Sequence, residues 1–423
     1  MRKLENIRIS TAIVIFLLGG VIVSAQGIIG FDTTKKIISS SLMSEEIDAD
    51  TLAIEESSPL DISNDRGLYL LAPDGNMQLR ILGSIRFSTF YDMVEMPVKN
   101  SFSTYYIPTG ENNIRQPNYY NTLNESRIGF EVKRKVGKRV IFGRLEMDFN
   151  GNNGQFRIRH AYGQIGNLLF GQTWSLFSNV SSMPATVDGN GPTGSVILRN
   201  PQIRYSTRVN SNMEFAAALE YSIPDLSTQD YDTLELETIQ LVPDLTGRIK
   251  RNGDFGDIQL SVVVNTISIK DPTYNVTNLF GFGSSLSGVF NLPEGQNIKY
   301  QATYGKSISH FITTFSGTGN DAVFSPSIGR YESLYSFGGF LSYGFDYNER
   351  ITSSVSLGYA NIFNKEYQAN KAYKNSLSLS FDAFWEIIRG ARVGFEYAYG
   401  RKWNLDNTSG RASRFWMLFY YDF

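Results

Sequence analysis

Hydrophobic and polar residues alternate with a period of two along most of the chain after residue 66. In residues 140–149, every second position is apolar or Gly, and the opposite parity ends in Arg, Glu and Asp. Such alternation predicts a β-strand with one apolar and one polar face. Residues 150–154 are rich in Asn and Gly and predict a turn, and Gly166-Asn167 predicts a two-residue hairpin.

The distribution of charge between the two faces of the strands distinguishes a membrane barrel from a soluble sheet. The apolar parity repeats along the whole segment, while the opposite parity carries several charges per hairpin. A closed barrel in lipid explains both faces, because apolar residues then contact acyl chains and polar residues face an aqueous lumen. After the first 25 residues no apolar stretch reaches the ~20 residues that a membrane-spanning helix needs, so insertion must occur by strands.

We predict an all-β fold, a transmembrane antiparallel β-barrel of sixteen strands. The predicted strands cover 78–91, 125–135, 139–149, 155–165, 168–177, 201–209, 213–222, 242–252, 256–270, 278–291, 297–309, 331–346, 351–362, 373–386, 391–403 and 412–423. Tight turns follow the even-numbered strands and longer loops the odd-numbered ones, the pattern of short periplasmic turns and long extracellular loops. The last strand ends at Phe423 on the apolar parity. We expect it to close the barrel against the first strand and to engage the barrel-assembly machinery.

Composition agrees with a barrel in the outer membrane of a Gram-negative cell. The chain holds 53 Tyr and Phe and 38 Gly but only 13 Pro, which suits long strands with aromatics at the lipid interfaces. It has no Cys, which excludes disulfides and thiolate metal sites. We expect no metal, no cofactor and no nucleic-acid partner, because no motif for any of them occurs.

The N-terminal part divides from the barrel by composition. Residues 1–25 combine a basic start with a short apolar core and predict a cleaved signal peptide. Residues 26–66 predict an acidic periplasmic spacer, since 26–65 carry nine acidic residues against two lysines. Residues 67–423 then form the predicted outer-membrane β-barrel domain, and residues 66–423 carry 34 Lys and Arg against 31 Asp and Glu.

Basic residues dominate the inward parity of the first strands. A ring or ladder of charge in a pore sets ion selectivity, so these residues predict an anion-selective lining. The alternative is that many of them pair across strands and brace the wall, with Glu146 opposite Arg157 as one such salt bridge. The predicted pore-lining residues are Arg80, Arg86, Arg127, Arg144, Arg157, Arg159, Arg204 and Arg208.

The loop 178–200 is rich in Gly, Pro and Ser and could either fold inward to narrow the pore or remain an exposed loop. The candidate constriction residues are Pro184, Asp188, Asn190 and Arg199. His160 shares its parity with Ile158 and Tyr162 and is expected to face outward, at a subunit or membrane interface.

These segments resemble the DcaP-like porins of Gram-negative outer membranes. The matching pieces are Ser126–Phe130, Arg157–Gly163 and Leu168–Ser175, and Val242–Leu245 matches more weakly. The resemblance implies a sixteen-stranded, trimeric diffusion channel whose third outer loop, here 178–200, folds into the lumen. It also implies a basic lumen that prefers small anions such as dicarboxylates. Members can carry an N-terminal coiled coil, whereas 26–66 shows no sustained heptad pattern.

The leading hypothesis is therefore a passive outer-membrane porin, homotrimeric, selective for small anionic solutes and not an enzyme. One alternative is a narrower, substrate-specific channel, for example for phosphate. A second alternative is a plugged barrel that acts as an enzyme or an adhesin. A hydrolase would need Ser, His and a polar partner that converge outside the barrel, and no spacing in the sequence singles out such a set.

Overall fold

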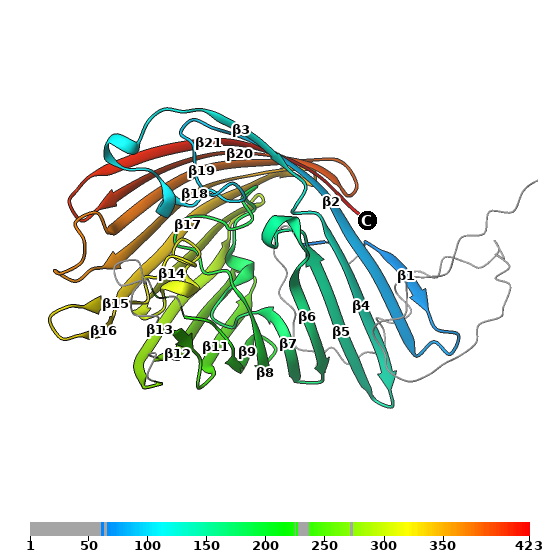
Figure 1. Ribbon diagram of the computed structural model, residues 1–423. Coiled ribbons are helices and arrows are strands. Elements are labelled where there is room, and N and C mark those ends of the chain that lie inside the picture. Colours follow the sequence, from blue (N-terminus) through cyan, green and yellow to red (C-terminus); the bar gives the residue numbers. More distant parts are fainter. Residues whose placement is uncertain (1–60, 63–65, 225, 227–236, 271–273) are drawn as a thin grey trace, which may run out of the picture. The chain divides into compact units, whose positions relative to one another are not determined.

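A computed structural model of the protein describes residues 61–62, 66–224, 226, 237–270 and 274–423. Sixteen antiparallel strands form a closed barrel in it, which confirms the predicted fold (Figure 1). They are β2 (Met77–Asp92), β4 (Arg127–Val136), β5 (Arg139–Asp148), β6 (Arg157–Ile165), β7 (Leu168–Trp174), β8 (Arg199–Asn210), β9 (Met213–Glu220), β11 (Asp244–Gly253), β12 (Gly256–Lys270), β13 (Val276–Asn291), β14 (Gln296–Lys306), β17 (Tyr335–Asn348), β18 (Ile351–Phe363), β19 (Tyr373–Ile388), β20 (Ala391–Asn404) and β21 (Ser409–Asp422). The predicted signal peptide and most of the predicted spacer lie outside the described residues.

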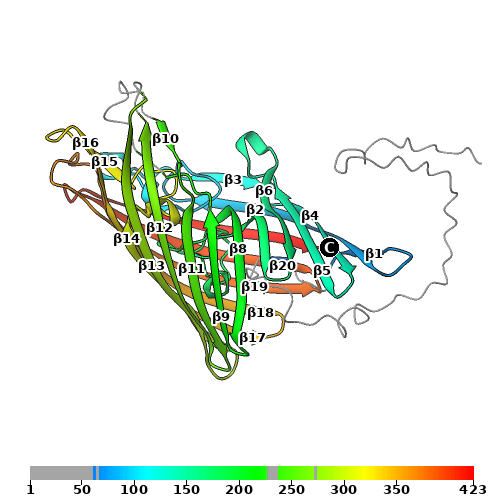
Figure 2. The same ribbon diagram turned by 90° about the horizontal axis from the view of Figure 1, so that it is seen from below.

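Pairing between the first and last barrel strands closes the sheet. Residues Ser84 to Asp92 of β2 pair with residues of β21 in antiparallel register. The backbone of Phe423 also exchanges hydrogen bonds with Gly83, at 3.0 and 2.9 Å. Closure leaves no open strand edge in the hydrocarbon, where an unpaired backbone group would be costly. Figures 1 and 2 show the inclined strands side by side around the barrel.

The two faces of the wall follow the alternation of the sequence. On β21, Phe415, Phe419 and Tyr421 are exposed on the outer face, while Arg414 and Trp416, on the opposite parity, are buried inside. An apolar outer face and a polar interior are the reverse of a soluble barrel and suit a lipid environment. No helix among the described residues is long and apolar enough to cross a membrane.

Two strands differ from their predicted ranges for a packing reason. β7 ends at Trp174 because Leu176 and Phe177 are both fully buried, so the alternation stops there. The predicted strand 331–346 is interrupted at Leu334. The backbone amide of Leu334 donates a 3.0 Å hydrogen bond to the carbonyl of Asp321 instead of to a neighbouring barrel strand. The first part of the predicted strand, β16 (Arg330–Ser333), pairs with β15 (Ala322–Ser325) in a separate hairpin.

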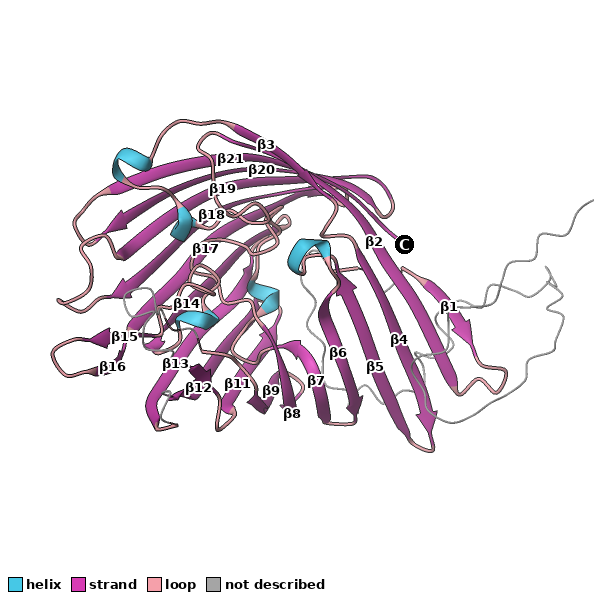
Figure 3. Ribbon diagram, in the orientation of Figure 1, coloured by secondary structure: helices cyan, strands magenta, loops and turns pink. Residues whose placement is uncertain are grey.

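Three short strands that the sequence did not predict extend the barrel sheet to nineteen strands. They are β1 (Leu68–Leu71), β3 (Asn118–Thr122) and β10 (Glu237–Ile239). β1 pairs with Gln78 to Ile81 of β2, where β21 no longer reaches. Short helical turns lie in the long connections, among them η3 (Thr104–Tyr106), η6 (Val180–Ser182) and η8 (Ser309–Phe311) (Figure 3).

Candidate functional site: an arginine-lined cavity in the barrel

Charged side chains form a row on the inner face of β2, β4 and β5. Nη1 of Arg80 lies 2.9 Å from Oε2 of Glu131 on the neighbouring strand. Glu131 is also 3.6 Å from Arg144, and Arg144 donates a 2.6 Å hydrogen bond to Glu146. Arg80 and Arg144 therefore brace neighbouring strands through pairs of opposite charge.

Arg157 and Arg159 continue this row on β6. Arg159 donates from Nε to Glu146 at 2.6 Å and from Nη1 to Asp148 at 3.3 Å. Arg157 makes two hydrogen bonds to Asp148, at 3.0 and 2.7 Å. The predicted salt bridge between Glu146 and Arg157 is wrong, because the strand register places Asp148 opposite Arg157.

A β-bulge on β6 produces this register. Glu146 lies opposite His160, and the next residue of β5 lies opposite Ile158. Arg159 is thus the extra residue, and the parity of the strand reverses at this point. Both Arg159 and His160 are buried, with exposed fractions of 7% and 1%. The predicted outward position of His160 is therefore wrong.

His160 instead positions a cation inside the barrel. Its Nδ1 lies 3.0 Å from the hydroxyl of Thr173, and its Nε2 accepts a 3.3 Å hydrogen bond from Nε of Arg199. Since Arg can only donate, a neutral His160 carries its proton on Nδ1. The guanidinium of Arg199 lies 3.5 Å from the ring centroid of Trp174, a cation–π contact. Arg199, expected within the loop, is the first residue of β8.

The other predicted arginines occupy different positions. Arg86 is fully buried inside the barrel, and Arg127 lies 3.2 Å from the carboxylate of Asp61. Arg204 is also buried and bonds groups of its own wall. Arg208 is exposed near the end of β8.

Five arginines meet at one cavity of about 730 Å³ inside the barrel. They are Arg86, Arg127, Arg157, Arg159 and Arg199. The acidic residues of the lining are Glu125 and Asp148, and Asp148 is already paired with arginines. Burial raises the pKa of Glu125, and the charges of Arg86 and Arg127 act against this shift. Four of the eight predicted pore-lining arginines are thus brought together, while Arg80, Arg144, Arg204 and Arg208 do not line this cavity.

The loop between β7 and β8 contacts the wall on the other side of the barrel. The amide of Val187 donates to Asp382 on β19 at 3.0 Å, and that of Asp188 donates to Glu396 on β20 at 2.7 Å. The amide of Val196 donates to Gln301 on β14 at 2.6 Å. The loop therefore crosses the interior, with Asn190 in the lining of the arginine cavity. That it narrows a conducting pore remains a prediction.

Asp188 joins this loop to the connection between β2 and β3, which contains Phe102. Its carboxylate accepts hydrogen bonds from the amide of Phe102 at 2.7 Å and from that of Asn190 at 3.0 Å. Burial, followed by the charge of Glu396, raises the pKa of Asp188 to about 7. Attachment of the loop is therefore linked to the protonation of buried carboxyl groups.

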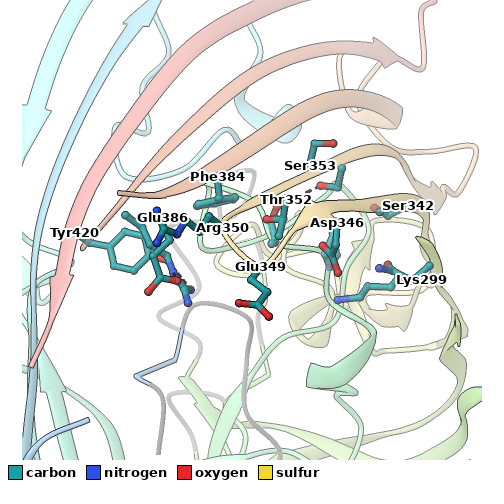
Figure 4. Close-up of a pocket in the computed structure, with 16 residues that line it drawn as sticks. Lys299, Ser342, Asp346, Glu349, Arg350, Thr352, Ser353, Phe384, Glu386 and Tyr420 are labelled. Carbon is teal, nitrogen blue, oxygen red and sulfur yellow. Dashed lines mark hydrogen bonds and ion pairs between the residues drawn. The ribbon is translucent and has the colours of Figure 1, made fainter. Parts of the chain in front are cut away.

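A second cavity, of about 260 Å³, is lined by Pro184 of the same loop and by charges of both signs (Figure 4). Lys299 and Asp346 are among them, and Lys299 donates a 2.8 Å hydrogen bond to the carbonyl of Met183. Neither Lys299 nor Asp346 is among the predicted pore-lining residues, which end at Arg208 on β8. The same alternation continues through β14 and β17 and would have found both residues.

The comparison with known families agrees with this architecture. The family model described as DcaP outer membrane protein matches residues 62–423. The chain belongs to the DcaP family. The protein is therefore an outer-membrane β-barrel of the porin type.

Solved structures show the same fold as this DcaP family chain. The crystal structure of the outer membrane channel DcaP of Acinetobacter baumannii has a TM-score of 0.73 at 18% identity, covering 84% of this chain and 99% of that one. An anion-selective porin from Comamonas acidovorans has a TM-score of 0.52 at 11% identity, covering 82% and 100%. Salmonella typhi OmpF, in complex with daunomycin, has a TM-score of 0.53 at 11% identity, covering 84% and 100%. No curated protein matched the sequence.

Three side chains in this DcaP family chain, Ser222, His310 and Asp321, are arranged in the sequence Ser–His–Asp of a hydrolase triad. Nε2 of His310 lies 3.3 Å from the hydroxyl of Ser222, and Nδ1 lies 2.8 Å from Asp321. The Ser222 hydroxyl, however, donates to the carboxylate of Asp244, so its proton is directed away from the imidazole. Ser222 is also buried, with 3% of its surface exposed. This geometry does not direct the Ser222 proton to His310 as a triad requires, and it is the family match that points to a channel.

Metal binding has no candidate in the part of the chain that the structure describes, where no three His, Cys, Asp or Glu side chains are grouped to hold an ion.

Proposed function

We propose that this protein is a passive diffusion channel for small hydrophilic solutes and that it prefers anions. The observation that carries the proposal is the cavity with five arginines and two acidic residues, Glu125 and Asp148. A lumen wall with excess fixed positive charge concentrates anions and repels cations.

Small carboxylates, including dicarboxylates, are the proposed solute class. A guanidinium offers paired donors that match a carboxylate, and several guanidiniums on one cavity can receive two carboxylates. Phosphate is the alternative anion, since arginine also binds phosphate. The Comamonas acidovorans neighbour is described as anion-selective, and the present proposal rests on this chain's own arginines.

Planar-bilayer recording of the purified protein under a KCl gradient tests the proposal. We expect a reversal potential that favours Cl⁻, and conductance steps in groups of three if the channel is a homotrimer. Current block by succinate and by phosphate at the same concentration distinguishes the two anion classes. A folded protein that gives no current would support the plugged-barrel alternatives instead.

Arginine substitutions connect the selectivity to the cavity. Replacing Arg157 and Arg159 by Ala should lower the anion preference by about fivefold per charge, the effect of a unit charge ~4 Å away in water. The matched control replaces Arg139 and Arg251, which are exposed and do not line the cavity. Loss of selectivity in the control, or an unchanged value in the cavity variant, contradicts the assignment.

A further inference from the structure

A carboxylate from the N-terminal segment lies inside the barrel at the arginine cavity. Oδ1 of Asp61 is 3.2 Å from Nη1 of Arg127 and 3.7 Å from Nη2 of Arg159. The Asp61 side chain is 6% exposed, and the following residue, Ile62, is also buried. One carboxylate oxygen therefore approaches two guanidiniums that line the cavity.

Asp61 differs from the acidic residues of the barrel wall because no barrel strand positions it. Glu146 and Asp148 belong to β5 and are fixed by the strand register. Asp61 precedes β1 and belongs to no strand, so its position depends on how the N-terminal segment is held. A carboxylate that reaches the arginines in this way occupies the position that a carboxylate solute would take.

Contacts after Asp61 anchor this segment at the end of the barrel where the tight turns lie. The carbonyl of Arg66 accepts a 2.8 Å hydrogen bond from Nε of Arg80. The guanidinium of Arg66 lies 3.6 Å from Glu386 on β19, two residues before a tight turn. β1 then pairs with the first part of β2. The chain is thus attached to the barrel wall at Arg66 and β1, shortly after Asp61.

We propose that Asp61 is a tethered competitor for the anion site. Its carboxylate neutralises part of the charge of Arg127 and Arg159, and carboxylate solutes bind there by displacing it. This inference rests on the proposed function, because it assumes that the arginine cavity receives anions. It adds that occupancy of the cavity is set by competition between solute carboxylates and one carboxylate of the chain itself.

The test measures current block by succinate in planar bilayers for the full-length protein, Asp61→Asn and Asp61→Glu. Asp61→Asn removes the charge and keeps the side-chain volume, so succinate should block at about fivefold lower concentration, the effect of a unit charge ~4 Å away in water. The Cl⁻ preference should rise in the same variant. Asp61→Glu retains the carboxylate and should remain close to the wild-type protein.

Asp74→Asn is the matched control, because Asp74 lies exposed in the turn between β1 and β2 and carries the same charge. It should leave block and selectivity unchanged. If the wild type is anion-selective and Asp61→Asn shows the same succinate block and Cl⁻ preference, only the proposal that Asp61 competes for the site is overturned. No anion selectivity and no succinate block in any variant overturns the proposed function. Equal effects of Asp61→Asn and Asp74→Asn would indicate a general charge effect and also reject the competitor.

Discussion

The attachment of the loop between β7 and β8 should depend on pH through Asp188. The group has an ordinary pKa of 3.8 and a pKa of about 7 in the folded protein. Below pH ~4 the carboxyl is protonated whether the loop is attached or released, and attachment is at its strongest. Between the two pKa values only the released loop loses the proton, so attachment weakens by about 1.4 kcal/mol per pH unit. Above pH ~7 the contribution of Asp188 to the free energy of loop attachment is lost completely, a change of about 4 kcal/mol.

Hydrogen exchange of the loop amides measures this dependence. The amides of Val187 and Asp188 are protected by Asp382 on β19 and Glu396 on β20. After correction for the intrinsic exchange rate, their protection should fall as the pH rises from 4.5 to 7. Glu396 and Arg414 on β21 also act on Asp188, and Asp188 interacts with Asp382, so the wild-type slope contains contributions from these groups.

Asp188→Asn isolates the contribution of this one group. When the logarithm of amide protection is plotted against pH, the slope for Asp188→Asn should be shallower than the wild-type slope by about one decade per pH unit, the effect of one proton. The control is Asp406→Asn in the β20–β21 connection, where hydrogen bonds from Thr408 lower the pKa of Asp406. Asp406 is therefore already ionised over most of this pH range, and its replacement should not alter the slope. Equal slopes for Asp188→Asn and the wild type would refute the reasoning.

Two further predictions concern the stability of the wall. Arg414 and Asp92 form a fully buried pair, with contacts of 2.6 and 3.0 Å, so Arg414→Leu should lower the free energy of unfolding by about 3–5 kcal/mol. Urea unfolding measures this change in stability. The double variant Arg414→Leu with Asp92→Asn should recover part of the loss. A cost below ~1 kcal/mol would be the value of an exposed ion pair and would contradict the prediction. Gly171 has φ +119°, and a Cβ there would lie 2.3 Å from the carbonyl oxygen of Ala161, so Gly171→Ala should cost at least ~1–3 kcal/mol. Gly143→Ala, where the nearest atom is 3.9 Å away, is the control, and equal losses would contradict the strain argument.

The arginine row shows how far the sequence could predict the site. Arg127 and Arg157 line the cavity as their alternation predicted, because side-chain direction in a regular strand is fixed by parity. Arg159 also lies inside as predicted, and the rule fails at His160, because the bulge places both neighbouring side chains inside. A bulge depends on how two strands align, and nothing in the pattern of β6 alone revealed it.

The sequence by itself determined the sixteen strands, their tight and long connections, and the closing strand at the end of the barrel, predicted over 412–423 and found at Ser409–Asp422. Period-two alternation and turn residues are local signals, and a lipid-facing surface makes them repeat along the chain. The tertiary structure alone decided which distant residues meet. It brought Asp61 to Arg127 across 66 residues of sequence, and it joined Asp188 of the loop to Glu396 across 208 residues. Such contacts depend on the curvature of the closed barrel, which spacing along the chain does not encode.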